Sequence, residues 1–159
     1  MKFIFLDVDG VLNTKYTRES IGLHRGIEDE LLDRLSVIVF SFKPVPRIVL
    51  TSSWKNAWDE HPPSIDKLAP HAQYLFERLR SRGLNITGRT EEKDENNRGQ
   101  GIQAWLRKVG GSDGWVVLDD CVFPDYEERG IIPHLVKTNE HFGLTDNEVE
   151  KAIKILRGV

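Results

Sequence analysis

Short runs of apolar residues recur along the chain, and each run ends at a polar or glycine-containing segment. A continuous apolar run of this length is typical of a strand that is buried on both faces, as in a parallel sheet. The runs predict five strands, at residues 2–6, 47–50, 84–87, 114–118 and 134–138, the last of them at a sheet edge.

Apolar residues at helical spacing separate these runs. Leu31, Leu35 and Ile38 predict a helix over residues 28–41 that ends before Pro44. Further helices are expected from Ser64 to Gly83 with a break at Pro70, from Arg98 to Val109, and after a capping box of Thr145 and Glu148. The alternation of strands and helices predicts an α/β fold of three layers, α/β/α, around a doubly wound, mainly parallel sheet of about five strands.

Length and composition narrow the class of protein. The 159 residues are enough for one domain, so we expect a single domain over residues 1–159. A chain that is 39% hydrophobic and 30% charged is typical of a globular protein rather than a disordered one. Its apolar runs are too short to span a membrane and the N-terminus lacks a signal-peptide pattern, so we expect a cytoplasmic protein without a membrane partner.

Cysteine and charge exclude some further classes. The lone Cys121 excludes an intramolecular disulfide and a cysteine-rich metal site. The net charge of −3 gives no global field that would attract a polyanion. A local basic patch could still bind one, so nucleic acid is neither implied nor excluded as a partner.

The first strand ends in an acidic segment, Asp7-Val8-Asp9-Gly10. Because side chains alternate along a strand, the carboxylates of Asp7 and Asp9 start on the same face. Two like charges so close together are costly unless a cation lies between them, whereas Gly10 allows a sharp turn or a close approach to a ligand. The alternative is an ordinary polar turn, in which Asp and Gly are common.

Polar residues also follow the second and fourth strands. Thr51, Ser52 and Ser53 come after residue 50, and Asp119 and Asp120 come after residue 118. Since parallel strands place their carboxyl ends at one edge of the sheet, we expect these groups to share that edge with Asp7. The serines could instead cap a helix, and Trp54 and Trp58, four residues apart, are expected to pack on one helix face.

A charged stretch, residues 88–100, shows no apolar period and is predicted to be mostly a solvated loop. It leads into the helix that opens at Arg98, whose guanidinium could lean toward an anion at the strand ends. Arg89 and Lys93 lie nearby in the sequence, and either could take that part instead.

Residues 5–12, Phe-Leu-Asp-Val-Asp-Gly-Val-Leu, resemble the first motif of the haloacid dehalogenase (HAD) superfamily, mostly magnesium-dependent phosphatases that work through an aspartyl-phosphate. Thr51, Arg98 and the pair Asp119-Asp120 are similar to its three later motifs, in family order. More narrowly, residues 7–13, 50–55, 98–106, 117–120 and 143–145 are similar to the small HAD domains related to Swiss-army-knife RNA-repair proteins. Gly101 departs from that pattern, since those relatives tend to carry Glu there, and the segments between motifs leave no room for a large cap domain.

The resemblance implies a role for each residue. Asp7 would be the nucleophile and Asp9 the general acid and base. Thr51, Ser52, Arg98 and the backbone near Gly10 would bind the phosphoryl group. Magnesium would be held by the Asp7 side chain, the Asp9 main-chain carbonyl and Asp120, with Asp119 in support; exchanged roles for these last two aspartates remain open.

The resemblance leaves the substrate and some rival functions open. The partner would be a phosphorylated substrate, either a small molecule or a nucleic-acid end, read by loops at residues 13–26, 55–63 and 89–97. A signalling receiver domain uses similar residues, but in a receiver an acidic pair follows the first strand and the lone phosphoacceptor aspartate comes later. In this chain the spaced pair Asp7 and Asp9 comes first and the adjacent pair Asp119-Asp120 comes last, which argues against a receiver. A binding or regulatory module with little turnover and a phosphotransferase also remain open, and an oligomer is possible.

Overall fold

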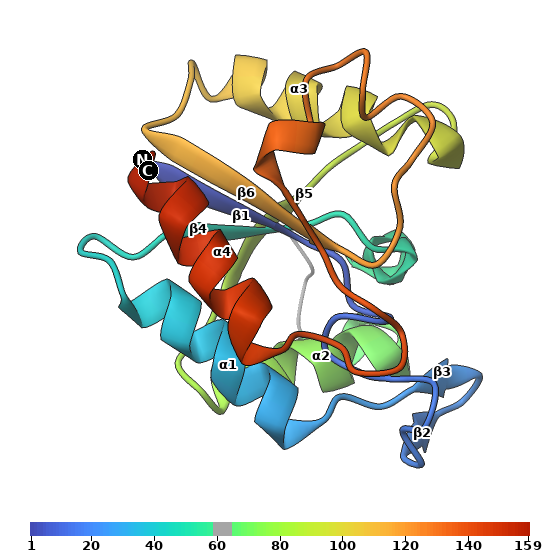
Figure 1. Cartoon of the computed structure of the whole chain (residues 1–159). Coiled ribbons are helices and arrows are strands. Elements are labelled where there is room, and N and C mark those ends of the chain that lie inside the picture. Colours follow the sequence, from blue (N-terminus) through green and yellow to red (C-terminus); the bar gives the residue numbers. More distant parts are fainter. Residues whose placement is uncertain (59–64) are drawn as a thin grey trace.

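The computed structural model describes residues 1–58 and 65–159. Its described residues form a parallel sheet of five strands in the order β5-β4-β1-β6-β7, with β7 at one edge (Figure 1). The strands are β1 (Lys2–Leu6), β4 (Arg47–Leu50), β5 (Ile86–Arg89), β6 (Gly114–Asp119) and β7 (Leu135–Lys137). The predicted parallel sheet is therefore confirmed.

Strand β5 begins two residues later than the predicted range of 84–87, so that boundary was wrong. Leu84 is buried, but its N–H donates to the carbonyl of Leu79 at 3.0 Å. Gly83, with φ of +71°, precedes it in the left-handed conformation that ends many helices. The apolar Leu84 thus closes the end of the preceding helix instead of joining the sheet.

Four α-helices occur in the described residues, close to their predicted places. They are α1 (Asp29–Phe40), α2 (Pro70–Arg80), α3 (Arg98–Lys108) and α4 (Asp146–Arg157). Pro70 stands in the first turn of α2, where its missing N–H costs no hydrogen bond, and the 3-10 helix η2 (Ile65–Lys67) precedes it. The capping box of Thr145 and Glu148 is confirmed, whereas the predicted start at Ser64 lies outside the described residues.

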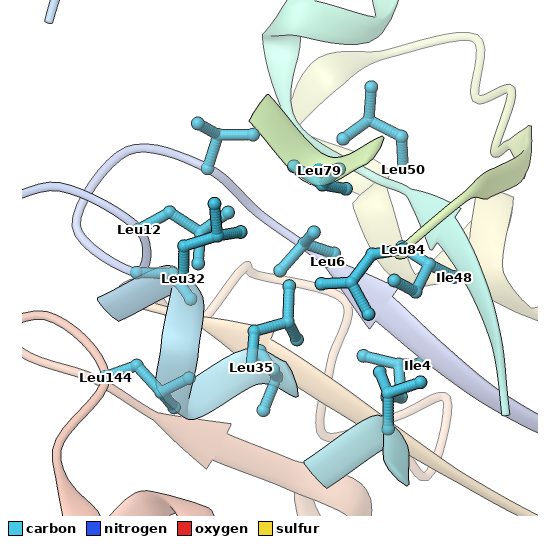
Figure 2. Packing of buried hydrophobic residues seen from close by; sticks show 14 of the residues in the cluster. Ile4, Leu6, Leu12, Leu32, Leu35, Ile48, Leu50, Leu79, Leu84 and Leu144 are labelled. Carbon is cyan, nitrogen blue, oxygen red and sulfur yellow. The ribbon is translucent and has the colours of Figure 1, made fainter. Parts of the chain in front are cut away.

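The helices cover the sheet on both faces and make three layers. Helices α1, α2 and α4 lie against one face, and α3 lies against the other (Figure 1). Because side chains alternate, Ile4 and Leu6 of β1 pack with Leu35 of α1 in the larger core (Figure 2), while Phe3 and Phe5 pack with Ile102 of α3. The predicted three-layer α/β/α architecture is confirmed.

The carboxyl edge of the sheet is held by backbone hydrogen bonds that continue beyond the strands. Asp7 donates its N–H to Leu118, and Thr51 donates to Leu6, both at 2.9 Å. Near this edge, within the residues 13–26 that were expected to form a loop, β2 (Ser20–Ile21) and β3 (His24–Arg25) make a short antiparallel hairpin. The described part of the chain contains no separate cap domain and no helix long and apolar enough to cross a membrane.

Candidate active site

The structure brings the ends of β1 and β6 and the start of α3 to one point. The Arg98 Nη1 atom lies 3.2 Å from Asp7 Oδ1 and 3.0 Å from Asp119 Oδ2. All three side chains are nearly buried, at 13%, 8% and 0% exposure. Because an isolated buried charge is expensive, the guanidinium and the two carboxylates depend on one another.

Arg98 is held on two further sides. Its guanidinium carbon lies 4.2 Å from the centre of the Phe123 ring, a cation–π contact. The first turn of α3 is tied down by Asp125, whose carboxylate accepts hydrogen bonds from the N–H groups of Gly99 at 3.1 Å and Gln100 at 2.9 Å. Arg89, one of the alternatives to Arg98, instead donates to the main-chain carbonyls of Lys55 and Trp58.

Carboxylates outnumber cations around Asp7. Burial raises the pKa of Asp7 well above its usual range, the Asp119, Asp120 and Asp9 carboxylates add to the rise, and Arg98 opposes it. Burial also raises the pKa of Asp119, although Arg98 and two hydrogen-bond donors work against it. The negative charge of this cluster is therefore only partly compensated by the protein.

The two adjacent aspartates have different surroundings. Asp119 is fully buried and accepts hydrogen bonds from the Cys121 N–H at 2.9 Å and the Tyr126 hydroxyl at 3.1 Å, besides Arg98. Asp120 is partly exposed and lies against Gly10, where an added Cβ would meet its Oδ2 at 2.4 Å. Gly10 has φ of +77° and its carbonyl accepts a hydrogen bond from the Thr138 hydroxyl at 2.7 Å, so only glycine fits beside Asp120.

The donor set fits a hard divalent cation. The ligand atoms of Asp119, Asp120 and Cys121 lie within 4.8 Å of one another, and the carboxylates of Asp119 and Asp120 are close enough to Asp7 to raise its pKa. Mg²⁺ and Ca²⁺ prefer carboxylate and carbonyl oxygens, and a cation would offset the uncompensated charge at Asp7. Cys121 itself is a poor nucleophile: although it is exposed, partial desolvation of its thiol and the Asp120 carboxylate raise the pKa of the thiol to about 11.

Thr51 and Ser52 follow β4 and differ in their contacts. The Thr51 Oγ1 atom is buried and has no hydrogen-bond partner among the described residues. The Ser52 hydroxyl accepts a hydrogen bond from the Trp54 N–H at 3.2 Å, which caps the 3-10 helix η1 (Ser53–Ala57). Ser52 thus caps a helix, which was the alternative to phosphoryl binding. Thr51 presents an unpaired hydroxyl at the sheet edge.

The Asp9 carboxylate accepts hydrogen bonds from two side chains to which the sequence had assigned no role in the site. Asn13 Nδ2 donates to Oδ1 at 2.9 Å, and Trp54 Nε1 donates to Oδ2 at 3.1 Å. Trp54 was expected to share a helix face with Trp58. Instead, η1 is only five residues long and turns Trp54 toward Asp9.

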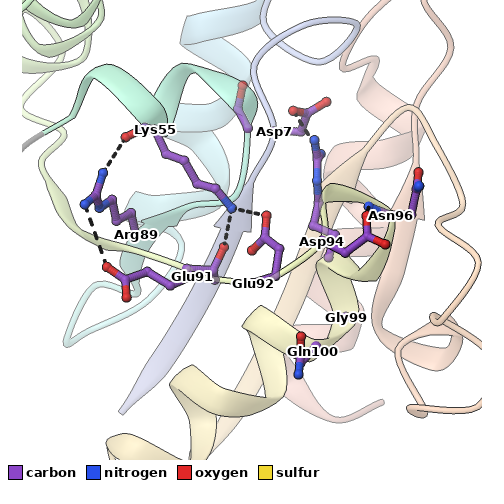
Figure 3. A network of polar contacts seen from close by, with 12 residues as sticks. Asp7, Lys55, Arg89, Glu91, Glu92, Asp94, Asn96, Gly99 and Gln100 are labelled. Atoms are coloured by element: carbon purple, nitrogen blue, oxygen red, sulfur yellow. Dashed lines mark hydrogen bonds and ion pairs between the residues drawn. The ribbon is translucent and has the colours of Figure 1, made fainter.

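A pocket of about 430 Å³ extends from Thr51 and Arg98 along the charged stretch. The buried Lys55 in its wall forms an ion pair with Glu92 (Figure 3). Lys55 also donates to the Thr90 hydroxyl at 3.2 Å. The prediction that residues 88–100 are mostly a solvated loop agrees with the exposed residues 93–96, but Gly88 and Arg89 belong to β5, and Thr90 and Glu92 have a buried partner in Lys55. The spacing of apolar residues could not predict the Lys55–Glu92 contact, because an ion pair between distant segments produces no repeating pattern in the sequence.

The pocket carries both signs of charge. Lys93, Glu91 and Glu95 also line it, and Arg89 lies with its guanidinium 3.7 Å from the Glu91 carboxylate. Of the loops expected to read the substrate, residues 89–97 and the start of 55–63 contribute to this pocket, whereas residues 59–63 lie outside the described residues.

Comparison with known proteins agrees with this geometry. Neither the search of curated proteins nor the search of solved structures found a match. A family model described as the HAD domain in Swiss Army Knife RNA repair proteins matches residues 3–149, which include the ends of β1, β4 and β6 and the start of α3. The chain therefore belongs to this family of small HAD domains.

Proposed function

We propose that this HAD domain is a magnesium-dependent phosphatase that works through an aspartyl-phosphate on Asp7. The observation that carries the proposal is the buried, unpaired Thr51 hydroxyl, which lines the same pocket as the Arg98 guanidinium. A phosphoryl group there would accept hydrogen bonds from both, and Asp7 lies 3.2 Å from that guanidinium.

The reaction proceeds in two steps, formation and hydrolysis of the aspartyl-phosphate. An Asp7 oxygen attacks phosphorus, the bond from phosphorus to the leaving oxygen breaks, and Asp9 donates its proton to that oxygen. A water molecule then attacks phosphorus, gives its proton to Asp9, and frees the Asp7 carboxylate with release of phosphate. Thr51, Arg98 and the backbone N–H groups near Gly10 stabilise the charge on the transferring group, which is the main source of rate enhancement in phosphoryl transfer.

Magnesium, when bound, would offset the negative charge that the phosphoryl group and the carboxylates bring together. Its ligands would be the Asp7 side chain, the Asp9 main-chain carbonyl and Asp120. Asp119 would support the site, because both of its oxygens already accept hydrogen bonds from the protein. Titration with Mg²⁺ tests this division: D120N should need a higher concentration of Mg²⁺ for half-maximal activity than D119N, and the opposite order would exchange the two roles.

The substrate is a phosphorylated small molecule or a nucleic-acid end. The description of the family names RNA repair proteins, which favours an end of RNA or DNA or a nucleotide. The mixed charges of the pocket, with Lys93 and Glu95 in its lining, are compatible with a polar leaving group.

The test is phosphate release by the purified protein with Mg²⁺ from nucleotides, oligonucleotides with 5′- or 3′-phosphates, phosphopeptides and sugar phosphates. D7N should lower the rate at least about 10³-fold, because the nucleophile is removed while the shape of the side chain is kept. D66N, which changes an exposed carboxylate on η2, is the matched control and should keep the full rate. Activity that survives in D7N, or that ignores chelation of magnesium, would refute the proposal.

A further inference from the structure

Both oxygens of the Asp9 carboxylate accept a hydrogen bond from a neutral, buried donor. Oδ1 accepts from Asn13 Nδ2 at 2.9 Å, and Oδ2 accepts from Trp54 Nε1 at 3.1 Å. Asn13 and Trp54 are both fully buried, whereas Asp9 is partly exposed, so the two donors are held by the protein while the carboxylate still faces the site.

The orientation of Asn13 is set by its other contacts. Its Oδ1 accepts a hydrogen bond from the Gly10 N–H at 2.9 Å, and a backbone N–H can only be met by the oxygen of an amide. The Nδ2 donor therefore faces Asp9, with a second, longer contact to the carbonyl of Arg25 at 3.4 Å. Asn13 thus joins the turn after β1, the hairpin and Asp9.

The orientation of Trp54 is also set by its surroundings. The centre of the His24 ring lies 4.9 Å from the indole, and the centre of the His71 ring lies 5.6 Å from it at an angle of 81°. The Ser52 hydroxyl holds the Trp54 main chain. These contacts come from β3, α2 and the end of β4, and they leave the indole N–H directed at Asp9.

We infer that Trp54 and Asn13 are positioning residues that hold Asp9 for proton transfer to the leaving oxygen. The inference rests on the proposed function, in which Asp9 is the general acid and base. A carboxyl group transfers a proton efficiently only when it is kept within hydrogen-bond reach of the reacting oxygen. Two rigid donors, one at each carboxylate oxygen, remove the freedom of the side chain to rotate away.

The chain offers a matched pair of tryptophans for the test. W54F removes the N–H that binds Asp9 and keeps an aromatic ring against His24 and His71, which stack on each other with their ring centres 4.1 Å apart. W58F removes an indole N–H that has no partner among the described residues, from another buried tryptophan. Both variants thus lose one indole N–H, but only W54F loses a contact to Asp9.

The measurement is kcat/KM with two aryl substrates of similar size, p-nitrophenyl phosphate and phenyl phosphate. Nitrophenolate leaves without a proton, whereas the more basic phenolate needs one from Asp9. W54F should lower kcat/KM for phenyl phosphate about tenfold more than for p-nitrophenyl phosphate, since general acid catalysis contributes about 10² to 10⁴ in rate. W58F should leave the ratio of the two values unchanged.

A loss in W54F that is equal for both substrates would show that Trp54 is only structural and would overturn the inference. N13D is the second variant, because it keeps the acceptor for the Gly10 N–H, replaces the donor to Asp9 with a carboxylate, and should change the ratio in the same direction. If W54F does not fold, N13D decides: an unchanged ratio overturns the inference.

Two further results separate this inference from the proposed function. Wild-type protein that releases phosphate neither from these two aryl phosphates nor from any of the phosphorylated substrates named above, or D7N that is as active as wild type, would refute the proposed function and the inference with it. An active wild type, an inactive D7N and a constant substrate ratio in W54F and N13D would refute the inference alone.

Discussion

Two buried cations lie in the wall of the same pocket, and the charge around them is balanced differently. Arg98 faces the carboxylates of Asp7 and Asp119, with Asp9 and Asp120 close enough to raise the pKa of Asp7 further. Lys55 faces one carboxylate, that of Glu92, and burial lowers the pKa of its ammonium although Glu92 opposes this.

The difference separates a reactive cluster from a structural one. The carboxylates around Arg98 exceed what one guanidinium can neutralise, so the cluster gains from a further cation. The buried Thr51 hydroxyl, which lines the same pocket as Arg98, has no hydrogen-bond partner among the described residues. The Lys55–Glu92 pair is neutral as a unit and shapes the pocket wall. Burial of charge is common to both, and the imbalance of charge is what distinguishes the proposed catalytic centre.

The largest expected effect on activity comes from removal of the Arg98 guanidinium. R98M should lower kcat/KM for phosphate release about 10² to 10³-fold and destabilise the fold by about 3 kcal/mol, because it leaves Asp7 and Asp119 buried without their partner. Phosphate release and urea unfolding measure the two effects. R98K, which keeps the charge but not the planar fork, should fall between wild type and R98M. R98M that matches wild type in activity would remove Arg98 from the site.

The second test applies the same change to the other cation. K55M should destabilise the protein by about 3 kcal/mol in urea unfolding, because Glu92 is then buried without a counter-charge. Its kcat/KM, measured below the unfolding transition, should stay within about tenfold of wild type. The double variant K55M/E92M should recover most of the stability, since a buried pair can be replaced by apolar residues of similar volume. A loss of activity as large as that in R98M would make Lys55 part of the catalytic centre.

The smallest expected effect concerns the packing of Glu92, the partner of Lys55, against Gly101. A Cβ at Gly101 would lie 2.5 Å from Glu92 Oε2, so G101A should cost about 1 to 2 kcal/mol through overpacking. In an E92A background the same change should be neutral or stabilising by up to about 1 kcal/mol, because alanine is the better helix residue. Urea unfolding of the four proteins gives the coupling between the two positions. An equal cost in both backgrounds would show that Glu92 does not lie against Gly101.

The sequence predicted the parts of the molecule that follow from a repeating pattern of apolar residues. Apolar runs gave the strands, and parallel pairing then placed Asp7, Thr51 and Asp119 at a common edge. The start of α3 at Arg98 was also predicted, because the helical period begins there. These residues could be found because sheet topology alone brings strand ends together.

The contacts that escaped prediction join segments with no period of their own. Trp54 meets Asp9 from 45 residues away, and Lys55 meets Glu92 from 37 residues away. Asp125, in an acidic loop, ties down the start of α3 from 26 residues away. Each contact depends on the direction of one side chain after packing, which residue spacing does not specify. Gly101, where the chain departs from the family pattern, lies against one of these contacts, since a Cβ there would meet the Glu92 carboxylate.

The backbone hydrogen bonds at the carboxyl edge also bear on how the protein can change during evolution. The N–H groups of Asp7, Thr51 and Thr138 are bonded to Leu118, Leu6 and Asp119, so they belong to the sheet itself. We expect such amides to open only when the whole fold opens, whereas those of the β2–β3 hairpin and of residues 91–97 should open locally. Substitutions in these surrounding segments can therefore accumulate and alter what is recognised, while the reacting groups stay fixed in the most stable part of the structure.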